Sequence, residues 1–182
     1  GYFEKEDALA AVDLLAAMTG LDVADIGLVG NSYGAATALE AAPLLPELAF
    51  VIADSAYADL ERILTYQARA QYGEVVTAVV PGVKFLSQVR ADLDMAAVSP
   101  ETAVAEADMP IMLSHSLQDE YTLPRHTEAI YARSNPTRTM IFLNDWGSPH
   151  GTDIVNQPER YAENVAIFLA AFAPEFGLDP VE

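Results

Sequence analysis

Residues 30–34 read Gly30-Asn31-Ser32-Tyr33-Gly34, which is a G-x-S-x-G sequence. An apolar run comes directly before it and a run of small residues directly after it. This context predicts a strand that turns sharply into a helix, with the serine hydroxyl standing clear of a sheet as a nucleophile. We expect both glycines to be required because side chains there would collide with the neighbouring strand and helix. The alternative is an ordinary strand–turn–helix junction with a capping serine.

The helix that begins at Tyr33 would point its first backbone N–H groups and its positive dipole end at the site. A nucleophilic serine that attacks a carbonyl needs N–H donors for the oxyanion that forms. The sequence therefore predicts that the backbone N–H of Tyr33 is one donor of an oxyanion hole.

Short apolar runs alternate with helical patterns along the chain. The apolar runs read as strands that are covered on both faces, as in parallel sheets. We predict strands at 26–29, 48–53, 110–114 and 138–143, and helices at 4–19, 33–42, 124–133 and from 158 onward. Gly20 is placed where a helix would end. This alternation predicts a single α/β domain over 1–182, with a mostly parallel sheet flanked by helices.

Residues 59–108 interrupt this alternation, because they contain helical pieces but no evident strand. A long insertion between two strands commonly covers or shapes an active site, so we expect a helical lid or pocket wall. The alternative is a crossover helix with a surface loop. Several aromatic residues are candidates to line a pocket, although such residues more often belong to a core: Tyr33, Tyr66, Phe85 and Trp146.

A base and an acid are expected in loops that follow later strands, in the order serine, acid, histidine. Asp119 lies just beyond the strand at 110–114, and His150 lies in a Gly- and Pro-containing loop after the strand at 138–143. We predict that His150 is the general base and that Asp119 orients and stabilises its ring. Asp54 is an alternative acid, although Asp54 and the residue after it read better as a turn. His115 and His126 are expected to make packing or capping contacts.

The formal charge of the chain is −18, from 27 acidic and 9 basic residues. Such a charge disfavours nucleic acids and anionic membrane surfaces as partners. No apolar run is long enough for a membrane helix, and the absence of cysteine excludes disulfides and thiol chemistry. The histidines have no metal-ligand spacing and no Gly-rich phosphate loop is present, so we expect no metal and no cofactor. The expected partner is a small-molecule ester or amide substrate.

Together these segments resemble the α/β-hydrolase superfamily across nearly the whole chain. The stretch 110–119 is similar to the proline-led strand that ends in His-Gly and then the triad acid, with Ser116 where glycine is usual. The stretch 51–60 and Ser99-Pro100 are similar to a branch that groups serine aminopeptidase and fermentation–respiration-switch esterases. The resemblance implies a Ser32–Asp119–His150 triad and hydrolysis through an acyl-enzyme.

The resemblance also implies strands, and a loop with a second oxyanion donor, ahead of the first helix. The chain begins at Gly1, so we expect a fragment or half of an assembly, with impaired activity. We further expect the strand at Ile26 to Val29 to lie at an exposed edge, where another chain or a second copy can pair with it.

Three functions follow from these observations. The leading hypothesis is hydrolysis of a carboxylic ester through an acyl-enzyme on Ser32. Hydrolysis of an amide or peptide by the same residues is the nearest alternative, because one triad serves both reactions. The third is a catalytically silent module of the same fold that acts in binding.

Overall fold

The sheet of this protein is parallel throughout. The computed structural model describes residues 1–177 and contains one sheet with the strand order β1-β2-β3-β4. Each strand pairs in parallel with the next one along the chain. The strands are β1 (Gly27–Asn31), β2 (Phe50–Asp54), β3 (Ile111–Ser116) and β4 (Thr139–Asn144). The predicted α/β class with a parallel sheet is confirmed.

The helices fill the intervals between the strands. The longer ones are α1 (Glu4–Thr19), α2 (Tyr33–Ala41), α3 (Leu60–Tyr72), α4 (Val80–Ala91), α6 (Arg125–Arg133) and α8 (Pro158–Phe172). The short ones are α5 (Pro100–Ala103), α7 (Asp153–Asn156) and the 3-10 turns η1 (Val23–Asp25), η2 (Ala42–Leu44), η3 (Glu74–Ala78), η4 (Met95–Ala97), η5 (Val104–Glu106) and η6 (Pro174–Phe176). Gly20 ends α1 in the left-handed conformation, with φ of 75°, as its position predicted.

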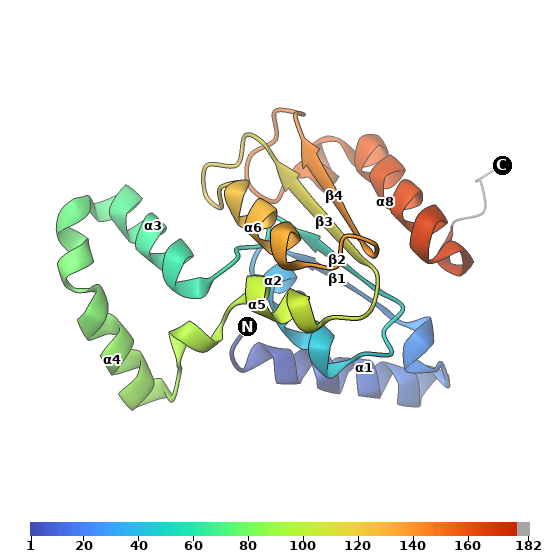
Figure 1. Cartoon of the computed structure of the whole chain (residues 1–182), viewed down its shortest axis with the longest axis horizontal. Helices are drawn as coiled ribbons and strands as arrows, with labels where there is room; N and C mark the ends of the chain where they lie inside the picture. The colour runs from blue at the N-terminus through green and yellow to red at the C-terminus, as the bar shows by residue number, and fades with distance from the viewer. Residues whose placement is uncertain (178–182) are drawn as a thin grey trace.

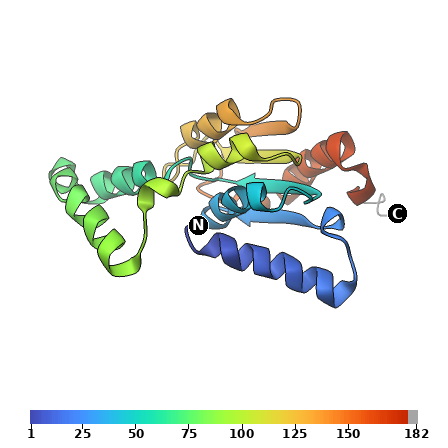
Figure 2. The same cartoon turned by 60° about the horizontal axis from the view of Figure 1, so that its bottom comes forward.

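Helices cover both faces of the sheet (Figures 1 and 2). Strand residues alternate between the faces, so Val51 and Ala53 join the core beneath α1, α2 and α6, whereas Phe50 and Ile52 join the core beneath α8. On the α8 side the ring of Phe50 meets that of Phe168 edge to face at 6.0 Å. The two inner strands, β2 and β3, are buried along their whole length. The sheet is therefore held from both sides.

Strand β1 lies at one edge of the sheet in the described structure. Its apolar sequence reads as a buried strand, but Val29 is 68% exposed. The difference arises because Val29 lies beside Ile52 on the α8 face, where a pocket separates β1 from α8. The edge position agrees with what the sequence predicted. Pairing of this edge with another chain stays a prediction.

Residues 59–108 contain helices and no strand, as the sequence indicated. Helices α3 and α4 project from the end of the sheet, while α5 returns to lie against α2 and α6 (Figure 1). The side chain of Phe85 on α4 is 65% exposed. Tyr66 on α3 instead reaches back, and its hydroxyl donates to the Glu120 carbonyl oxygen at 2.9 Å. The insertion is thus tied to the loop that carries Asp119.

Across residues 1–177, none of the helices combines the length and the apolar character that crossing a membrane requires.

Candidate active site

Ser32 occupies the sharp turn between β1 and α2. Its backbone has φ of 54° and ψ of −116°, a conformation that costs a non-glycine residue on the order of 1–3 kcal/mol. The Ser32 N–H donates to the Asp54 carbonyl oxygen at 2.8 Å, which fixes the turn to the end of β2. Ser32 therefore stands at the carboxyl end of the sheet, in a strained conformation that the neighbouring strand helps to hold.

The two glycines beside Ser32 are not equivalent. A Cβ atom at Gly30 would overlap the backbone of Gly34, so the first glycine is required by space, as the sequence predicted. The prediction for Gly34 is wrong, because no atom of the described structure beyond its chain neighbours and the backbone of its own helix lies within 4 Å of the position its Cβ would take. The first turn of α2 thus passes close to the end of β1. The space that it fills is the space that a side chain at Gly30 would need.

The three side chains that the sequence singled out lie together. His150 Nε2 is 2.7 Å from Ser32 Oγ, and His150 Nδ1 is 2.6 Å from Asp119 Oδ2. A carboxylate only accepts, so Nδ1 carries a proton that it donates to Asp119. In the neutral ring Nε2 is then free to accept the Ser32 hydroxyl proton. Ser32, His150 and Asp119 form a continuous hydrogen-bonded path.

Asp119 is buried and accepts hydrogen bonds at both oxygens. Oδ1 accepts from the N–H groups of Tyr121 at 2.9 Å and Thr122 at 2.8 Å, while Oδ2 meets His150 and also His115 Nε2 at 3.0 Å. Burial alone would raise the pKa of Asp119, but the hydrogen bonds from His115, His150 and Thr122 outweigh it and hold the pKa well below its usual value. The carboxylate is therefore ionised opposite His150.

His115 has a larger part in this arrangement than the sequence indicated. It is fully buried, and its Nε2 lies 2.6 Å from the Thr122 carbonyl oxygen as well as near Asp119. Both neighbours accept, so Nε2 carries a proton that the two share. The other ring nitrogen, Nδ1, lies 2.6 Å from Thr127 Oγ1. His115 is buried in the core, but both of its ring nitrogens make polar contacts, and one of these contacts is to Asp119.

The loops that carry Asp119 and His150 are fastened to each other. Ser116 Oγ donates to the Ser148 carbonyl oxygen at 2.5 Å, so the serine that replaces the usual glycine links the two loops. Gln118 adds two more contacts, donating to Asp145 Oδ1 at 2.6 Å and accepting from the Gly147 N–H at 3.1 Å. These contacts fix the spacing between acid and base.

Asn31, the residue before Ser32, joins the Ser32 turn to the His150 loop. Its Nδ2 donates to the Gly151 carbonyl oxygen at 3.1 Å and to Asp54 Oδ2 at 3.3 Å.

Asp54, the alternative acid, therefore faces Asn31 and also accepts from Ser55 Oγ at 3.1 Å, whereas the His150 ring faces Asp119. Burial raises the pKa of Asp54 to about 6, against the effect of the Ser55 hydrogen bond, and the nearby Asp153 adds to the rise.

Two further groups border Ser32 and His150. Helix α2 begins at Tyr33, and the first N–H groups of a helix have no acceptor within it, so the Tyr33 N–H lies at the helix N-terminus beside Ser32. Its part in an oxyanion hole stays a prediction. The ring of Tyr121 lies 4.9 Å from the His150 ring, a contact with no signal in the sequence beyond its closeness to Asp119. Trp146, in contrast, packs against Arg160.

Comparison with known proteins places the chain in a family. Residues 1–173 match the model of the prolyl oligopeptidase family. The chain is 28% identical to the uncharacterised protein YqkD of Bacillus subtilis over 174 residues, which are 93% of this chain and 55% of YqkD.

Solved structures share the fold. An esterase of Pyrococcus furiosus superposes with a TM-score of 0.67 at 22% identity, over 94% of this chain and 63% of the esterase. An acylaminoacyl peptidase of Pyrococcus horikoshii superposes with a TM-score of 0.66 at 19% identity, over 98% of this chain and 28% of the peptidase. The chain thus spans less than two thirds of the length of these relatives.

The resemblance to α/β-hydrolases is confirmed by these matches, which include esterases and peptidases alike. Because the family model covers nearly the whole chain, this protein belongs to the prolyl oligopeptidase family of serine hydrolases.

Proposed function

We propose that this chain hydrolyses carboxylic esters through an acyl-enzyme on Ser32. The observation that carries the proposal is the hydrogen-bonded path from Ser32 through His150 to the ionised Asp119. An isolated serine hydroxyl is a weak nucleophile, and a neighbouring base that can take its proton is what activates it.

In the first half of the reaction, Ser32 Oγ attacks the carbonyl carbon while its proton passes to His150 Nε2. Asp119 stabilises the imidazolium, and the Tyr33 N–H donates to the oxyanion. The tetrahedral intermediate then collapses, and His150 returns the proton to the leaving alcohol. In the second half, His150 takes a proton from water, the resulting hydroxide attacks the acyl carbon, and Ser32 leaves with the proton.

Hydrolysis of an amide or peptide is the second candidate. It is favoured by the family match and by the likeness to an acylaminoacyl peptidase. The same residues would serve, with His150 donating its proton to an amine rather than to an alcohol. In either case we propose that residues 59–108 act as a wall or lid of the substrate pocket, because Tyr66 ties α3 to the Asp119 loop.

The test is covalent labelling of the chain with a fluorophosphonate, followed by identification of the modified residue. We expect labelling at Ser32, none in Ser32→Ala, and turnover in Asp119→Asn reduced on the order of 10³–10⁴-fold. Labelling that persists in Ser32→Ala would contradict the proposal. An intact fold with no labelling at all would favour the catalytically silent module. Matched 4-nitrophenyl ester and 4-nitroanilide substrates with one acyl group then separate ester from amide hydrolysis.

A further inference from the structure

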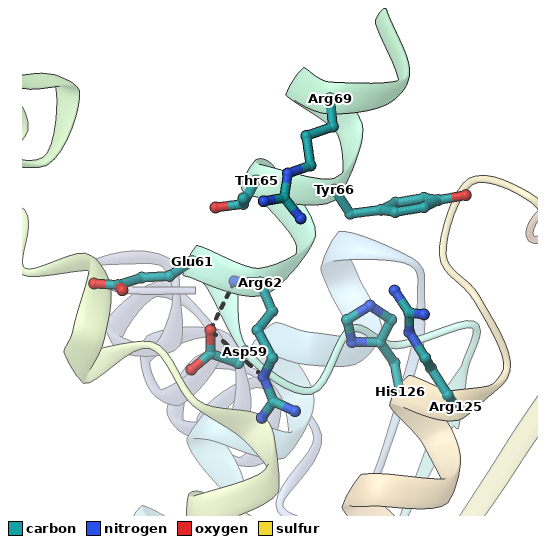
Figure 3. A pocket seen from close by; sticks show the side chains of 8 residues that line it. All are labelled: Asp59, Glu61, Arg62, Thr65, Tyr66, Arg69, Arg125 and His126. Atoms are coloured by element: carbon teal, nitrogen blue, oxygen red, sulfur yellow. Dashed lines mark hydrogen bonds and ion pairs between the residues drawn. The ribbon is translucent and has the colours of Figure 1, made fainter. Parts of the chain in front are cut away.

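A pocket of about 630 Å³ lies between α3 and the start of α6, next to the Asp119 loop (Figure 3). None of the triad residues lines it, so it is distinct from the catalytic groups. Tyr66, one of its walls, donates to the carbonyl oxygen of Glu120, the residue that follows Asp119. The lining residues are Asp59, Glu61, Arg62, Thr65, Tyr66, Arg69, Arg125 and His126.

Arginine side chains are concentrated in this pocket. Three of the nine basic residues of the chain line it, although the protein has 27 acidic residues. Arg62 is paired with Glu101, and Arg69 Nε lies 3.3 Å from Glu74 Oε2. Arg125 differs from both, since no carboxylate oxygen of residues 1–177 lies within 4.0 Å of its nitrogens; it lies over the ring of Tyr66 at 5.5 Å. Its guanidinium donors are therefore available to a ligand.

The two acidic residues of the lining are already engaged. Asp59 Oδ1 caps α3 by accepting from the Arg62 N–H at 2.8 Å, and Glu61 is paired with Lys84. Neither carboxylate is paired with Arg125, but both lower the net positive charge of the pocket. A singly charged ligand therefore fits the lining better than a doubly charged one.

His126 gives a second and independent sign of a ligand. Its side chain is only 3% exposed, and its Nδ1 accepts from the Ala58 N–H at 3.2 Å. The neutral ring then carries its proton on Nε2, and this buried atom has no acceptor among the described residues. Burial, together with the charges of Arg125 and Arg62, lowers the pKa of His126 to about 4, so the ring is neutral near pH 7. A buried donor without an acceptor is costly, and a ligand oxygen that displaced the atoms now covering Nε2 would satisfy it.

We propose that this pocket binds a carboxylate carried by the substrate. Figure 3 shows the Arg125 and His126 side chains extending from α6 toward α3, and both line the pocket. The planar guanidinium of Arg125 supplies charge and paired donors, and His126 Nε2–H supplies a neutral donor. The inference rests on the proposed function, and it narrows the substrate class to esters or amides that bear a carboxylate away from the scissile bond.

The first test compares two esters of similar shape, 4-nitrophenyl hemisuccinate and the neutral 4-nitrophenyl butyrate. The measured quantity is the ratio of their kcat/KM values. We expect Arg125→Gln to lower the ratio about tenfold, because a charge-assisted hydrogen bond to the carboxylate is lost. Arg125→Lys should restore part of it. Arg133→Gln is the matched control, since it removes an exposed arginine from the other end of α6, and its ratio should stay within about twofold of the unmodified chain.

An unchanged ratio in Arg125→Gln, or an equal change in Arg133→Gln, would overturn the proposal. The second test separates a substrate carboxylate from a free anion that binds there. Monomethyl succinate should bind to Ser32→Ala by calorimetry, should not bind to Ser32→Ala carrying Arg125→Gln, and should compete with the hemisuccinate ester. If monomethyl succinate instead stimulates hydrolysis of the butyrate ester, the pocket binds an effector. That result would overturn the proposal that the pocket binds a carboxylate of the substrate.

The two proposals fail in different ways. If no ester is hydrolysed but monomethyl succinate still binds through Arg125, the proposed function fails and the carboxylate site stands. If esters are hydrolysed at Ser32 and no binding is detected, the carboxylate site fails and the hydrolase stands.

Discussion

His115 Nε2 lies 3.0 Å from the same Asp119 oxygen that meets His150 Nδ1. Asp119 is thus held between two imidazole rings, of which only the His150 ring contacts Ser32. Because His115 is fully buried on β3, its position is fixed by the sheet. We predict that His115 acts on Asp119 as a positioning residue.

Replacing His115 with Leu removes the N–H that Asp119 Oδ2 and the Thr122 carbonyl share. We expect kcat to fall about tenfold with little change in KM, because the loss acts on Asp119 and not on substrate contacts. His115→Gln, which keeps a donor, should recover part of kcat. A raised KM with an unchanged kcat would contradict the positioning role.

His115→Leu should also change the stability of the fold at acid pH. The pKa of Asp119 is lowered in the folded state, so its carboxylate stabilises the fold above the unfolded pKa, and this contribution is lost as pH falls through the folded pKa. Without the His115 donor the lowering is smaller, and the acid unfolding midpoint should move to higher pH. Circular dichroism during acid titration measures it, with Thr127→Val as a control that removes the hydroxyl on the far side of the His115 ring.

The two glycines that flank Ser32 give a matched pair for stability. Gly30→Ala places a Cβ against the backbone of Gly34 and should lower the free energy of unfolding by roughly 1–3 kcal/mol. Gly34→Ala enters open space within α2 and should leave that free energy unchanged or raise it by up to about 1 kcal/mol, because alanine favours a helix more than glycine does. Urea denaturation of both variants tests the difference, and equal losses would contradict it.

Asp54 should make stability depend on pH in the opposite direction to Asp119. Burial raises its folded pKa to about 6, above the unfolded value of 3.8, so its contribution is full below the unfolded pKa and is lost as pH rises through about 6. Asp54→Asn removes this titration. The unfolding free energy of the variant relative to the unmodified chain should therefore rise between about pH 4 and pH 7, by on the order of 3 kcal/mol. If the difference in unfolding free energy stays constant over this range, the pKa of Asp54 is not raised in the folded state.

The sheet and the three grouped side chains could be predicted because they depend on short-range rules. Each apolar run marks a strand, and the carboxyl ends of parallel strands meet at one edge, so Asp119 and His150 had to approach Ser32. Ser116 shows the limit of this reasoning: its departure from glycine is visible in the sequence, but its hydrogen bond to the Ser148 carbonyl depends on how two loops meet.

The pocket could not be foreseen for the same physical reason. Arg125 and His126 are adjacent in the sequence and read as an ordinary first turn of a helix. Their common direction, and the approach of Tyr66 from α3, depend on how the insertion packs. The expectation for Gly34 failed because a motif states which residues are usual and not which of them is crowded in this chain.

The contacts of Ser116, Gln118 and Asn31 all run between loops of the sheet itself, and none of them involves α3 or α4. For protein engineering, this separates the grouped side chains of Ser32, His150 and Asp119 from the two projecting helices. Substitutions on α3 and α4, apart from Tyr66, whose hydroxyl bonds the Glu120 carbonyl oxygen, can be screened for new substrate preference while the spacing of Ser32, His150 and Asp119 is kept by bonds that lie elsewhere.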